Sequence, residues 1–125
     1  MIVEQRTYIV KPGRTAEYLA AVETLGLPIM RPLLGGLIGY FVTEIGALNQ
    51  VVHLWAYDSL EDRARRRKAV EEHPGWPAFT EAVRPLFERM ETRVMTPASF
   101  TPLTLESIRA MNRPAPAGEQ RLAHE

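Results

Sequence analysis

The chain has 125 residues, of which 46% are hydrophobic, and its 15 basic and 15 acidic residues give a formal net charge of zero. This length and apolar content predict one domain with one packed core, and the balanced charge gives no global attraction to nucleic acid or to an anionic membrane. The lack of cysteine excludes disulfides, thiolate metal sites and a cysteine nucleophile. Charges near the start argue against a signal peptide, and no apolar run approaches the ~20 residues that span a bilayer. We therefore expect a cytoplasmic protein without a membrane span.

The first half of the chain predicts a strand, a helix and a second strand. Residues 2–10 are rich in β-branched and aromatic side chains and end at a Lys-Pro-Gly turn. A helix is predicted from Thr15, because apolar residues recur at spacings of three and four as far as Ile29. Pro32 and the glycines that follow it are expected to end this helix. Residues 37–45 then predict the second strand.

The second half continues with a strand, a helical region and a last strand. Residues 50–57 predict a strand that forms a β-hairpin with the preceding one. Ser59 is expected to cap a highly charged helix, which ends near residues 73–75. Helical spacing resumes over residues 79–90, with a kink or restart at a proline inside the segment. Residues 91–95 predict the last strand.

The resulting order of elements, β-α-β-β-α-β, predicts an α+β fold of the ferredoxin-like type. In that fold a four-stranded antiparallel sheet carries its helices on one face. The other face meets water or a partner. One set of alternating strand positions is too apolar to face water over the area of a sheet, and its members are Val3, Ile9, Val52, Leu54 and Ala56. We therefore predict a homodimer formed through a sheet face.

The predicted domain ends near residue 103, and residues 104–125 form a tail rich in proline and polar residues. Leu105, Ile108 and Met111 are spaced as on one face of a short helix, but a helix of this length is marginal when isolated. We expect a mostly mobile tail. The alternative is a tail that docks on a neighbouring surface through these three residues.

Three stretches resemble the NIPSNAP family, in the order in which the family has them. They are IVEQRTY with KPG (residues 2–13), GYF with EIG (residues 39–46) and NQVVHLWAYDSLEDR (residues 49–63). The resemblance covers residues 1–103 and leaves the tail outside.

Membership of this family implies the dimeric α/β-barrel superfamily, in which two ferredoxin-like sheets close against each other. The resemblance implies no agreed enzymatic activity. More distant relatives with this barrel include cofactor-free monooxygenases, haem-degrading enzymes and small-molecule isomerases, and they support an analogy of fold only. The first hypothesis is therefore a homodimeric module for interaction or small-molecule binding. The alternative is a cofactor-free small-molecule enzyme, monooxygenase-like or isomerase-like, with a pocket between sheet and helices.

Strand alternation gathers polar and aromatic side chains on one face of the predicted sheet. The first and third strands are adjacent in this fold, and side chains two residues apart share a face. The candidate ligand-binding residues that this rule brings together are Arg6, Tyr8, His53, Trp55 and Tyr57, with Tyr40 and Arg93 as extensions from the outer strands. Relatives in the superfamily place ligands beside an aromatic residue near the end of the third strand, which is the region of Trp55 and Tyr57.

Two interpretations of this face stay open. The same residues can form a ligand pocket, or they can be core and dimer contacts in which Arg6 forms a plain ion pair with Glu4 or with a glutamate across the sheet. His53 is the candidate catalytic residue, because an imidazole is the one side chain here whose ordinary pKa lies near neutrality, as a general base requires.

Other patterns predict no site. The basic run at residues 63–68 is bracketed by acidic residues at helical spacing, which indicates a solvated helix face rather than a nucleic-acid or phosphate patch. The glycines match no phosphate loop. His53, His73 and His124 lack the spacing of a zinc site, and haem degradation is disfavoured because the first strand lacks the asparagine that those relatives use. We expect no metal and no cofactor.

Overall fold

A computed structural model describes residues 1–114 of the chain. Its elements are β1 (Ile2–Val10), α1 (Thr15–Ala21), the π-helical turn η1 (Val22–Gly26), α2 (Leu27–Leu34), β2 (Leu37–Val42), β3 (Gln50–Tyr57), α3 (Leu60–Glu71), α4 (Trp76–Val83), the 3₁₀ turn η2 (Arg84–Leu86), β4 (Phe87–Met95) and α5 (Leu105–Met111). None of the helices in this described part is both long enough and apolar enough to cross a membrane.

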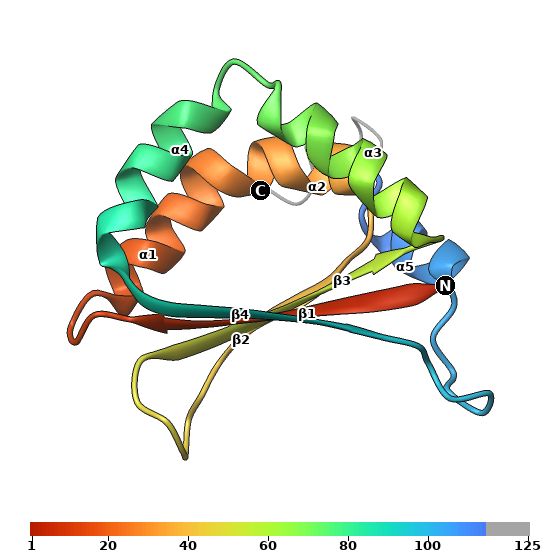
Figure 1. The fold of residues 1–125 in the computed structure, drawn as a ribbon, viewed down its shortest axis with the longest axis horizontal. Helices are drawn as coiled ribbons and strands as arrows, with labels where there is room; N and C mark the ends of the chain where they lie inside the picture. The colour runs from red at the N-terminus through yellow and green to blue at the C-terminus, as the bar shows by residue number, and fades with distance from the viewer. Residues whose placement is uncertain (115–125) are drawn as a thin grey trace, which may run out of the picture.

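The four strands form one antiparallel sheet in the order β2-β3-β1-β4. Helices α1 to α4 arch over one face of this sheet, and the opposite face carries no helix of the arch (Figure 1). The predicted α+β fold, with its ferredoxin-like strand order and one-sided helix layer, is thereby confirmed. The central pair is β1 and β3, in which Arg6 lies opposite His53 and Tyr8 opposite Val51.

The first helical segment is longer than the sequence predicts. Helix α1 runs into α2 through the π-turn η1, and α2 continues past Pro32 to Leu34. A π-turn accommodates the lost hydrogen bond and the ring of a nearby proline, here Pro28 near the start of α2. The true end is Gly35, whose φ of 74° is the left-handed conformation that favours glycine at a helix C-terminus.

Helix α3 begins at the predicted cap and is fixed by a buried carboxylate. The Ser59 hydroxyl accepts a hydrogen bond from the backbone N–H of Asp62 at 3.0 Å, and the Asp62 carboxylate accepts one from the N–H of Asp58 at 3.0 Å. That carboxylate also pairs with Arg65 at 2.7 Å and Arg66 at 2.8 Å. Part of the basic run therefore serves ion pairs within the helix, as its acidic neighbours indicate.

The last strand starts earlier than expected. The helical spacing that continues to Met90 wrongly extends the helix, because Pro85 lies in the turn η2 and β4 begins directly after it at Phe87. The backbone N–H of Lys11 donates to the Leu86 carbonyl at 2.8 Å. This bond connects the end of the turn to the residue that follows β1, so β4 begins beside β1 directly after the turn.

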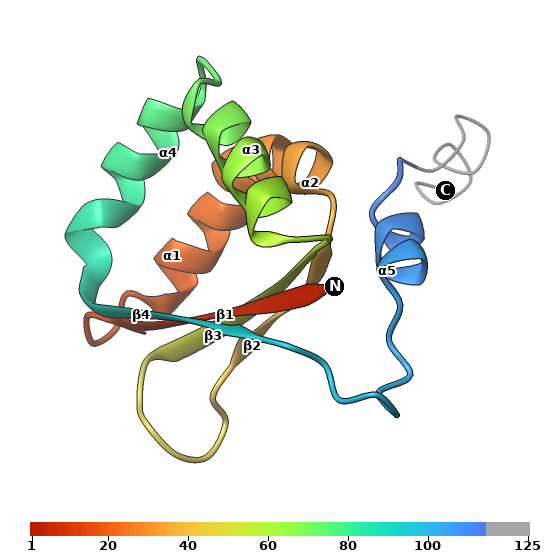
Figure 2. The same cartoon turned by 45° about the vertical axis from the view of Figure 1, so that its right-hand side comes forward.

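The start of the tail docks on the domain, which corrects the expectation of a mostly mobile segment for this part of the chain. Helix α5 contacts β2 and β3 and lies beside the end of the sheet where the N-terminus is found (Figure 2). The Asn112 amide donates to the Leu37 carbonyl at 2.9 Å and accepts from Arg31 Nε at 2.9 Å. Arg109 reaches Asp62 at 3.2 Å. Residues 115–125 lie outside the described part of the chain.

Ile108 is the buried anchor of α5, with 0% of its surface exposed. Ile108→Ala is expected to lower the free energy of unfolding by about 2–4 kcal/mol, since truncating a fully buried isoleucine loses its transfer energy and leaves a cavity. Urea denaturation measures this change. Met111→Ala, on the exposed side of the same helix, is the control and should change stability by about 0.5 kcal/mol or less. Equal effects of the two substitutions would contradict docking.

Candidate functional site

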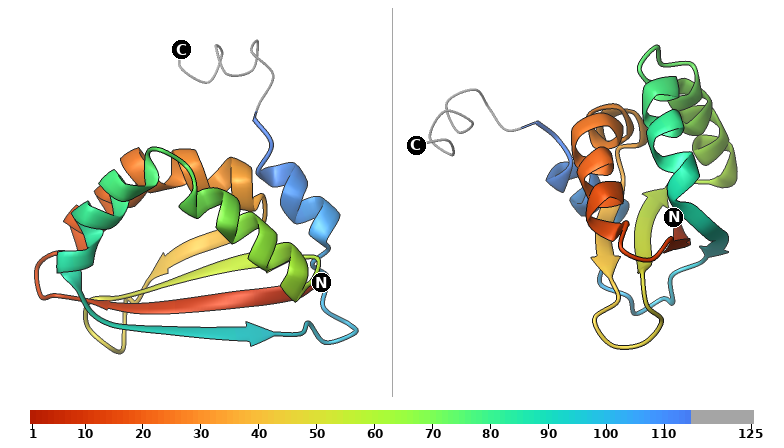
Figure 3. Two further views of the ribbon diagram at one scale, coloured as in Figure 1. Left: turned by 45° about the horizontal axis from the view of Figure 1, so that its top comes forward. Right: turned by 90° about the vertical axis from the view of Figure 1, so that its left-hand side faces the viewer.

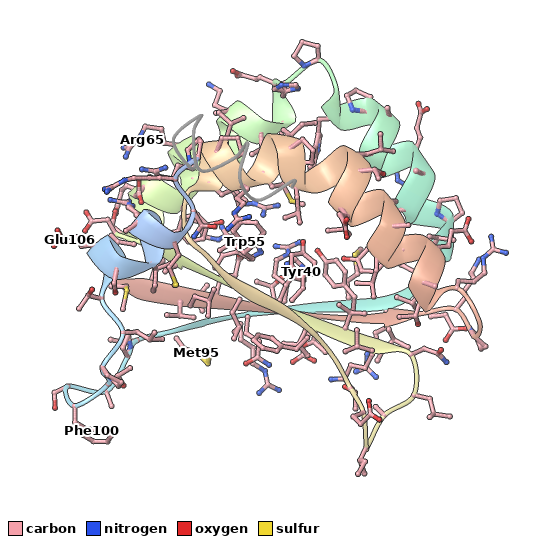
Figure 4. All side chains as sticks on the ribbon, turned by 180° about the vertical axis from the view of Figure 1, so that it is seen from behind. Tyr40, Trp55, Arg65, Met95, Phe100 and Glu106 are labelled. Atoms are coloured by element: carbon pink, nitrogen blue, oxygen red, sulfur yellow. The ribbon has the colours of Figure 1, made fainter. Side chains whose placement is uncertain are left out.

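A cavity of about 220 Å³ lies between the sheet and the helical arch. Its walls come from both layers, and Figure 4 shows Tyr40 and Trp55 pointing from the sheet into this space. The residues that line it are mostly aromatic or apolar, with three arginines: Arg6, Tyr8, Tyr18, Met30, Leu34, Tyr40, His53, Trp55, Arg67, Trp76, Phe79, Thr80, Val83, Arg84, Phe87 and Met90. Arg84 and Met90 are exposed, which places an opening of the cavity beside them.

Most of the residues predicted from strand alternation meet at this cavity. They are Arg6, Tyr8, Tyr40, His53 and Trp55. All five lie on the helix-facing side of the sheet, where Arg6 and Tyr40 flank His53 from the two neighbouring strands. Their role in binding a ligand stays a prediction.

Two predicted residues do not line the cavity. Tyr57 is buried on the same face of the sheet, but beyond Trp55, where burial and the Glu4 carboxylate raise the pKa of its phenol to about 12. Arg93 lies opposite Gln5, which places it on the helix-free face. There it is exposed and pairs with Glu91 at 3.0 Å. The alternation rule gives the face of a strand residue only relative to its own strand, so it could not assign Arg93 without the register of β4.

The helices supply lining residues that strand alternation could not identify. Tyr18, Phe79 and Val83 belong to helix faces that spacing marks as buried, but periodicity does not distinguish a packed side chain from one that borders a cavity. Arg67 belongs to the basic run at residues 63–68, which the sequence predicts to be a solvated helix face, so its place at the cavity was not predicted. Arg84 follows α4 directly in the turn η2, and no sequence pattern marks it.

Aromatic rings hold the His53 imidazole in place. Tyr40 stacks on it with ring centres 4.4 Å apart and planes within 10°, and Tyr8 meets it edge-on at 4.9 Å. The Trp55 indole N–H donates to His53 Nδ1 at 2.7 Å. His53 Nε2 is buried and has no hydrogen-bond partner in residues 1–114. One ring nitrogen is therefore bonded within the core, while the other is unpaired in a residue that lines the cavity.

Burial lowers the pKa of His53 to about 3, with the positive charges of Arg6 and Arg67 acting in the same direction. The ring is therefore neutral near pH 7. Its pKa lies far below the near-neutral value that made it the candidate general base.

The displaced pKa predicts a pH dependence of stability. Because the folded pKa of about 3 lies below the ordinary value of 6.5, unfolded protein binds a proton first as the pH falls through 6.5. Between pH 6.5 and pH 5 the free energy of unfolding should fall by about 1.6 kcal/mol, because the slope rises from half of 1.36 kcal/mol per pH unit at pH 6.5 toward the full value. Urea denaturation at several pH values tests this. A stability that stays level over this range would mean that His53 accepts a proton freely in the folded protein.

The arginines of the cavity carry more positive charge than nearby carboxylates balance. Arg6 Nε donates to the Tyr8 hydroxyl at 2.8 Å, and its Nη1 lies 3.4 Å from Glu4, whose carboxylate is also bound by Arg63. Arg67 and Arg84 form no ion pair in the described part of the chain. Among residues 1–114 no aspartate or glutamate lines the cavity, so its electrostatic field favours an anion.

Within residues 1–114 there is no group of three histidine or acidic side chains that could hold a metal ion. His53 is enclosed by aromatic rings, and His73 Nδ1 accepts the backbone N–H of Gly75 at 3.0 Å. His124 lies outside the described residues. That the protein uses no metal or cofactor stays a prediction from the sequence.

Comparison with known proteins gives the family of this fold. The NIPSNAP family model matches residues 3–102, which is most of the described chain. The chain belongs to the NIPSNAP family. Among curated relatives, "Protein NipSnap homolog 1" of Danio rerio is 44% identical over 66 residues, which are 53% of this chain and 24% of that protein. "Protein NipSnap homolog" of Dictyostelium discoideum is 35% identical over 97 residues, 78% of this chain and 43% of that protein. The chain therefore spans less than half the length of these NIPSNAP relatives.

Solved NIPSNAP structures have the same architecture. A NIPSNAP family protein with unknown function from Agrobacterium tumefaciens is 45% identical, with a TM-score of 0.80, and the match covers 83% of this chain and 94% of that one. An uncharacterized NIPSNAP-like domain protein from Burkholderia xenovorans is 48% identical, with a TM-score of 0.78 and coverage of 82% and 89%. An antibiotic biosynthesis monooxygenase-type protein from Nitrosomonas europaea, 15% identical with a TM-score of 0.59 over 78% of this chain and 98% of that one, shares the fold alone.

Proposed function

We propose that this NIPSNAP protein is a homodimeric binding module that holds a small apolar or aromatic anion in the cavity of each protomer. The observation that carries the proposal is the charge of the cavity: in the part of the chain that the structure describes, three arginines and no carboxylate border a space with aromatic walls. Arginine is suited to such a site because its guanidinium stays charged and binds carboxylates through two parallel hydrogen bonds. The cytoplasmic location remains a prediction from the sequence.

The size of the cavity limits the ligand to one that contains about one ring. A cavity of about 150 Å³ holds benzene in another protein, and the volume here is about 220 Å³. This leaves room for one ring with a carboxylate or a similar small group. Drug-sized ligands need pockets of about 300 Å³ or more. Small aromatic acids therefore fit the volume, the walls and the charge together.

The chemistry of the cavity favours binding over catalysis by the sequence's candidate base. His53 is neutral with a pKa of about 3, and burial raises the pKa of Tyr40 and Tyr18 far above their ordinary value. None of these groups exchanges protons readily near pH 7. The cofactor-free enzyme therefore stays the second candidate.

The homodimer is proposed from the helix-free face of the sheet. Apolar side chains occur along it on all four strands, and Figure 4 shows Met95 on this side, away from the helices. Phe41, opposite Val52 in the same register, is 52% exposed. A second copy of the chain, related by a two-fold axis, would cover the same patch on both protomers. Such an interface should bury more than about 1,600 Å² in total.

Binding is tested with benzoate and phenylacetate, titrated by calorimetry. Arg67→Gln and Arg84→Gln are each expected to weaken binding about three- to tenfold, because each removes one unpaired positive charge from the cavity. Arg89→Gln is the matched control: it removes the same charge from the helix-free face, where Arg89 lies opposite Ile9, and should leave affinity unchanged. Benzylamine should bind more weakly than benzoate.

Two results would count against the proposal. Benzylamine that binds as tightly as benzoate would show that the arginines do not select the ligand. An absence of heat and of thermal stabilisation with both acids at millimolar concentration would show that the cavity does not take aromatic anions.

A further inference from the structure

We infer that Trp55 fixes His53 as a permanent hydrogen-bond donor, so that the cavity binds its ligand through an oxyanion and takes weak acids such as phenols and enols in their ionised form. Trp55 is then a positioning residue and His53 a residue that sets ligand specificity. The inference rests on the proposed function, because it requires that a small molecule enters the cavity.

The tautomer of His53 follows from the identity of its partner. An indole N–H is a donor and never an acceptor, so the 2.7 Å contact from Trp55 Nε1 requires a lone pair on His53 Nδ1. The ring is neutral near pH 7 and carries one proton. That proton must therefore sit on Nε2, and the imidazole cannot take a second proton there.

The donor on Nε2 has no acceptor within the described protein. His53 Nε2 is buried without a hydrogen-bond partner, and a buried polar group in this condition is destabilising. The groups that face the ring are Tyr40 stacked on one side, Tyr8 edge-on and Arg6 opposite it in the sheet. None of these neighbours offers a carboxylate. Because His53 lines the cavity, we infer that the acceptor comes from what occupies the cavity.

The surrounding charge selects an acceptor that is negative. Burial is the main cause of the lowered pKa of His53, and the positive charges of Arg6 and Arg67 act in the same direction; the same two charges stabilise an oxygen anion near Nε2–H. Fixed donors and cations in a site with little water lower the pKa of a bound acid. When a phenol or enol binds, its O–H bond breaks and the proton passes to bulk water, while the oxygen keeps the electron pair and accepts from Nε2–H.

The tautomer is measured first, in the protein without ligand. Two-bond ¹⁵N–¹H correlation NMR on the imidazole distinguishes a protonated Nε2 from a protonated Nδ1. We expect one tautomer, with the proton on Nε2, unchanged between pH 6 and pH 8. In Trp55→Phe, which lacks the indole N–H, both tautomers should appear. A proton found on Nδ1 in the unaltered protein would overturn the inference whether or not a ligand binds.

The ligand state is measured with 4-nitrophenol, which absorbs visible light only when ionised. Bound 4-nitrophenol should have a pKa at least about one unit below that of the free compound, which corresponds to a tenfold preference for the anion. In the double variant His53→Phe with Trp55→Phe, anion affinity should fall about tenfold. This variant removes donor and acceptor together and leaves no indole N–H unpaired. Arg89→Gln serves again as the control and should behave like the unaltered protein.

The outcomes separate this inference from the proposed function. If 4-nitrophenol binds with an unchanged or raised pKa, or if the double variant binds the anion as tightly, the oxyanion site is wrong while anion binding by the arginines still stands. If neither benzoate nor 4-nitrophenol binds, the proposed function fails and this inference fails with it. A lowered pKa that depends on His53 supports both.

Discussion

Glu4→Gln is expected to lower the free energy of unfolding by about 3–5 kcal/mol, because it removes one partner from a buried ion pair. Glu4 is 0% exposed, and its Oε2 accepts hydrogen bonds from Arg63 Nε at 2.8 Å and from Arg63 Nη2 at 2.5 Å. Arg6 approaches the same oxygen at 3.4 Å. A neutral amide leaves two partly buried guanidinium groups without a counter-charge. Urea denaturation at pH 7 gives the change in midpoint from which this value follows.

The control for this prediction is Glu17→Gln. Glu17 pairs with Arg14 at 2.7 Å on the surface, where more than half of each side chain is exposed. Exposed pairs contribute about 1 kcal/mol or less. The two substitutions make the same chemical change, so burial is the variable that differs. Similar losses for the two variants would show that the Glu4 ion pair contributes little to the fold.

The Glu4 ion pair also shows why the sequence could give only part of the candidate site. A plain pair between Arg6 and Glu4 was one of the two interpretations left open from the sequence, and the structure contains it together with the cavity. The stronger partner of Glu4 is Arg63, which lies 59 residues away on α3. Strand alternation relates residues within one strand, and residues of neighbouring strands once their register is known, but it says nothing about which helix residue reaches across the layers. The helix arch above the sheet supplies that contact (Figure 3).

The parts of the site that could be predicted are those fixed by the sheet. The ferredoxin-like order makes β1 and β3 neighbours, and the two-residue period then places Arg6, His53 and Trp55 on one face. The direction of that face, toward the helices, follows in the structure from the burial of His53 and Trp55. Arg93 could not be assigned, because its face depends on the register of β4.

Errors at the ends of elements have a common physical origin. Local spacing extended a helix through Phe87, but the 3₁₀ turn at Pro85 and the bond from Lys11 to the Leu86 carbonyl bring the chain into the sheet there. The short length of α5 also led to the expectation that the tail would be mostly mobile and this helix marginally stable. Its stability comes from the burial of Ile108 and the bonds of Asn112, which are tertiary contacts. In both places tertiary structure outweighs the local pattern.

The sequence left two interpretations open for His53, as a residue of the core or as a residue of a ligand site. The structure supports both, since Nδ1 accepts a hydrogen bond from Trp55 and the residue lines the cavity, while Nε2 is buried without a hydrogen-bond partner among residues 1–114. Loss of stability and loss of binding are therefore both expected when His53 alone is replaced. Only the double variant with Trp55→Phe separates the two effects, because it leaves no unpaired indole N–H.

The second large effect concerns the proposed dimer. Leu54→Lys is expected to convert the homodimer into monomers, with a rise of about a thousandfold or more in the dimer dissociation constant. Leu54 lies on the central strand β3, opposite Gln5 on one side and Gly39 on the other, on the helix-free face. A lysine there would bring an unpaired charge into the interface. A two-fold axis repeats the change in both protomers, so that about 2 kcal/mol lost per protomer gives about 4 kcal/mol in total.

Light scattering coupled to size-exclusion chromatography at micromolar concentration measures the mass of each variant. Leu60→Lys is the matched control, because Leu60 is 59% exposed at the start of α3, in the helical layer over the other face of the sheet. That variant should remain a dimer, and circular dichroism should show that both variants keep their secondary structure. The long side chain of a lysine can lie along an apolar surface with its charge in water, so monomeric Leu54→Lys is expected to stay folded. An unaltered chain that is monomeric at this concentration would refute the homodimer, and a dimeric Leu54→Lys would place the interface away from the centre of this face.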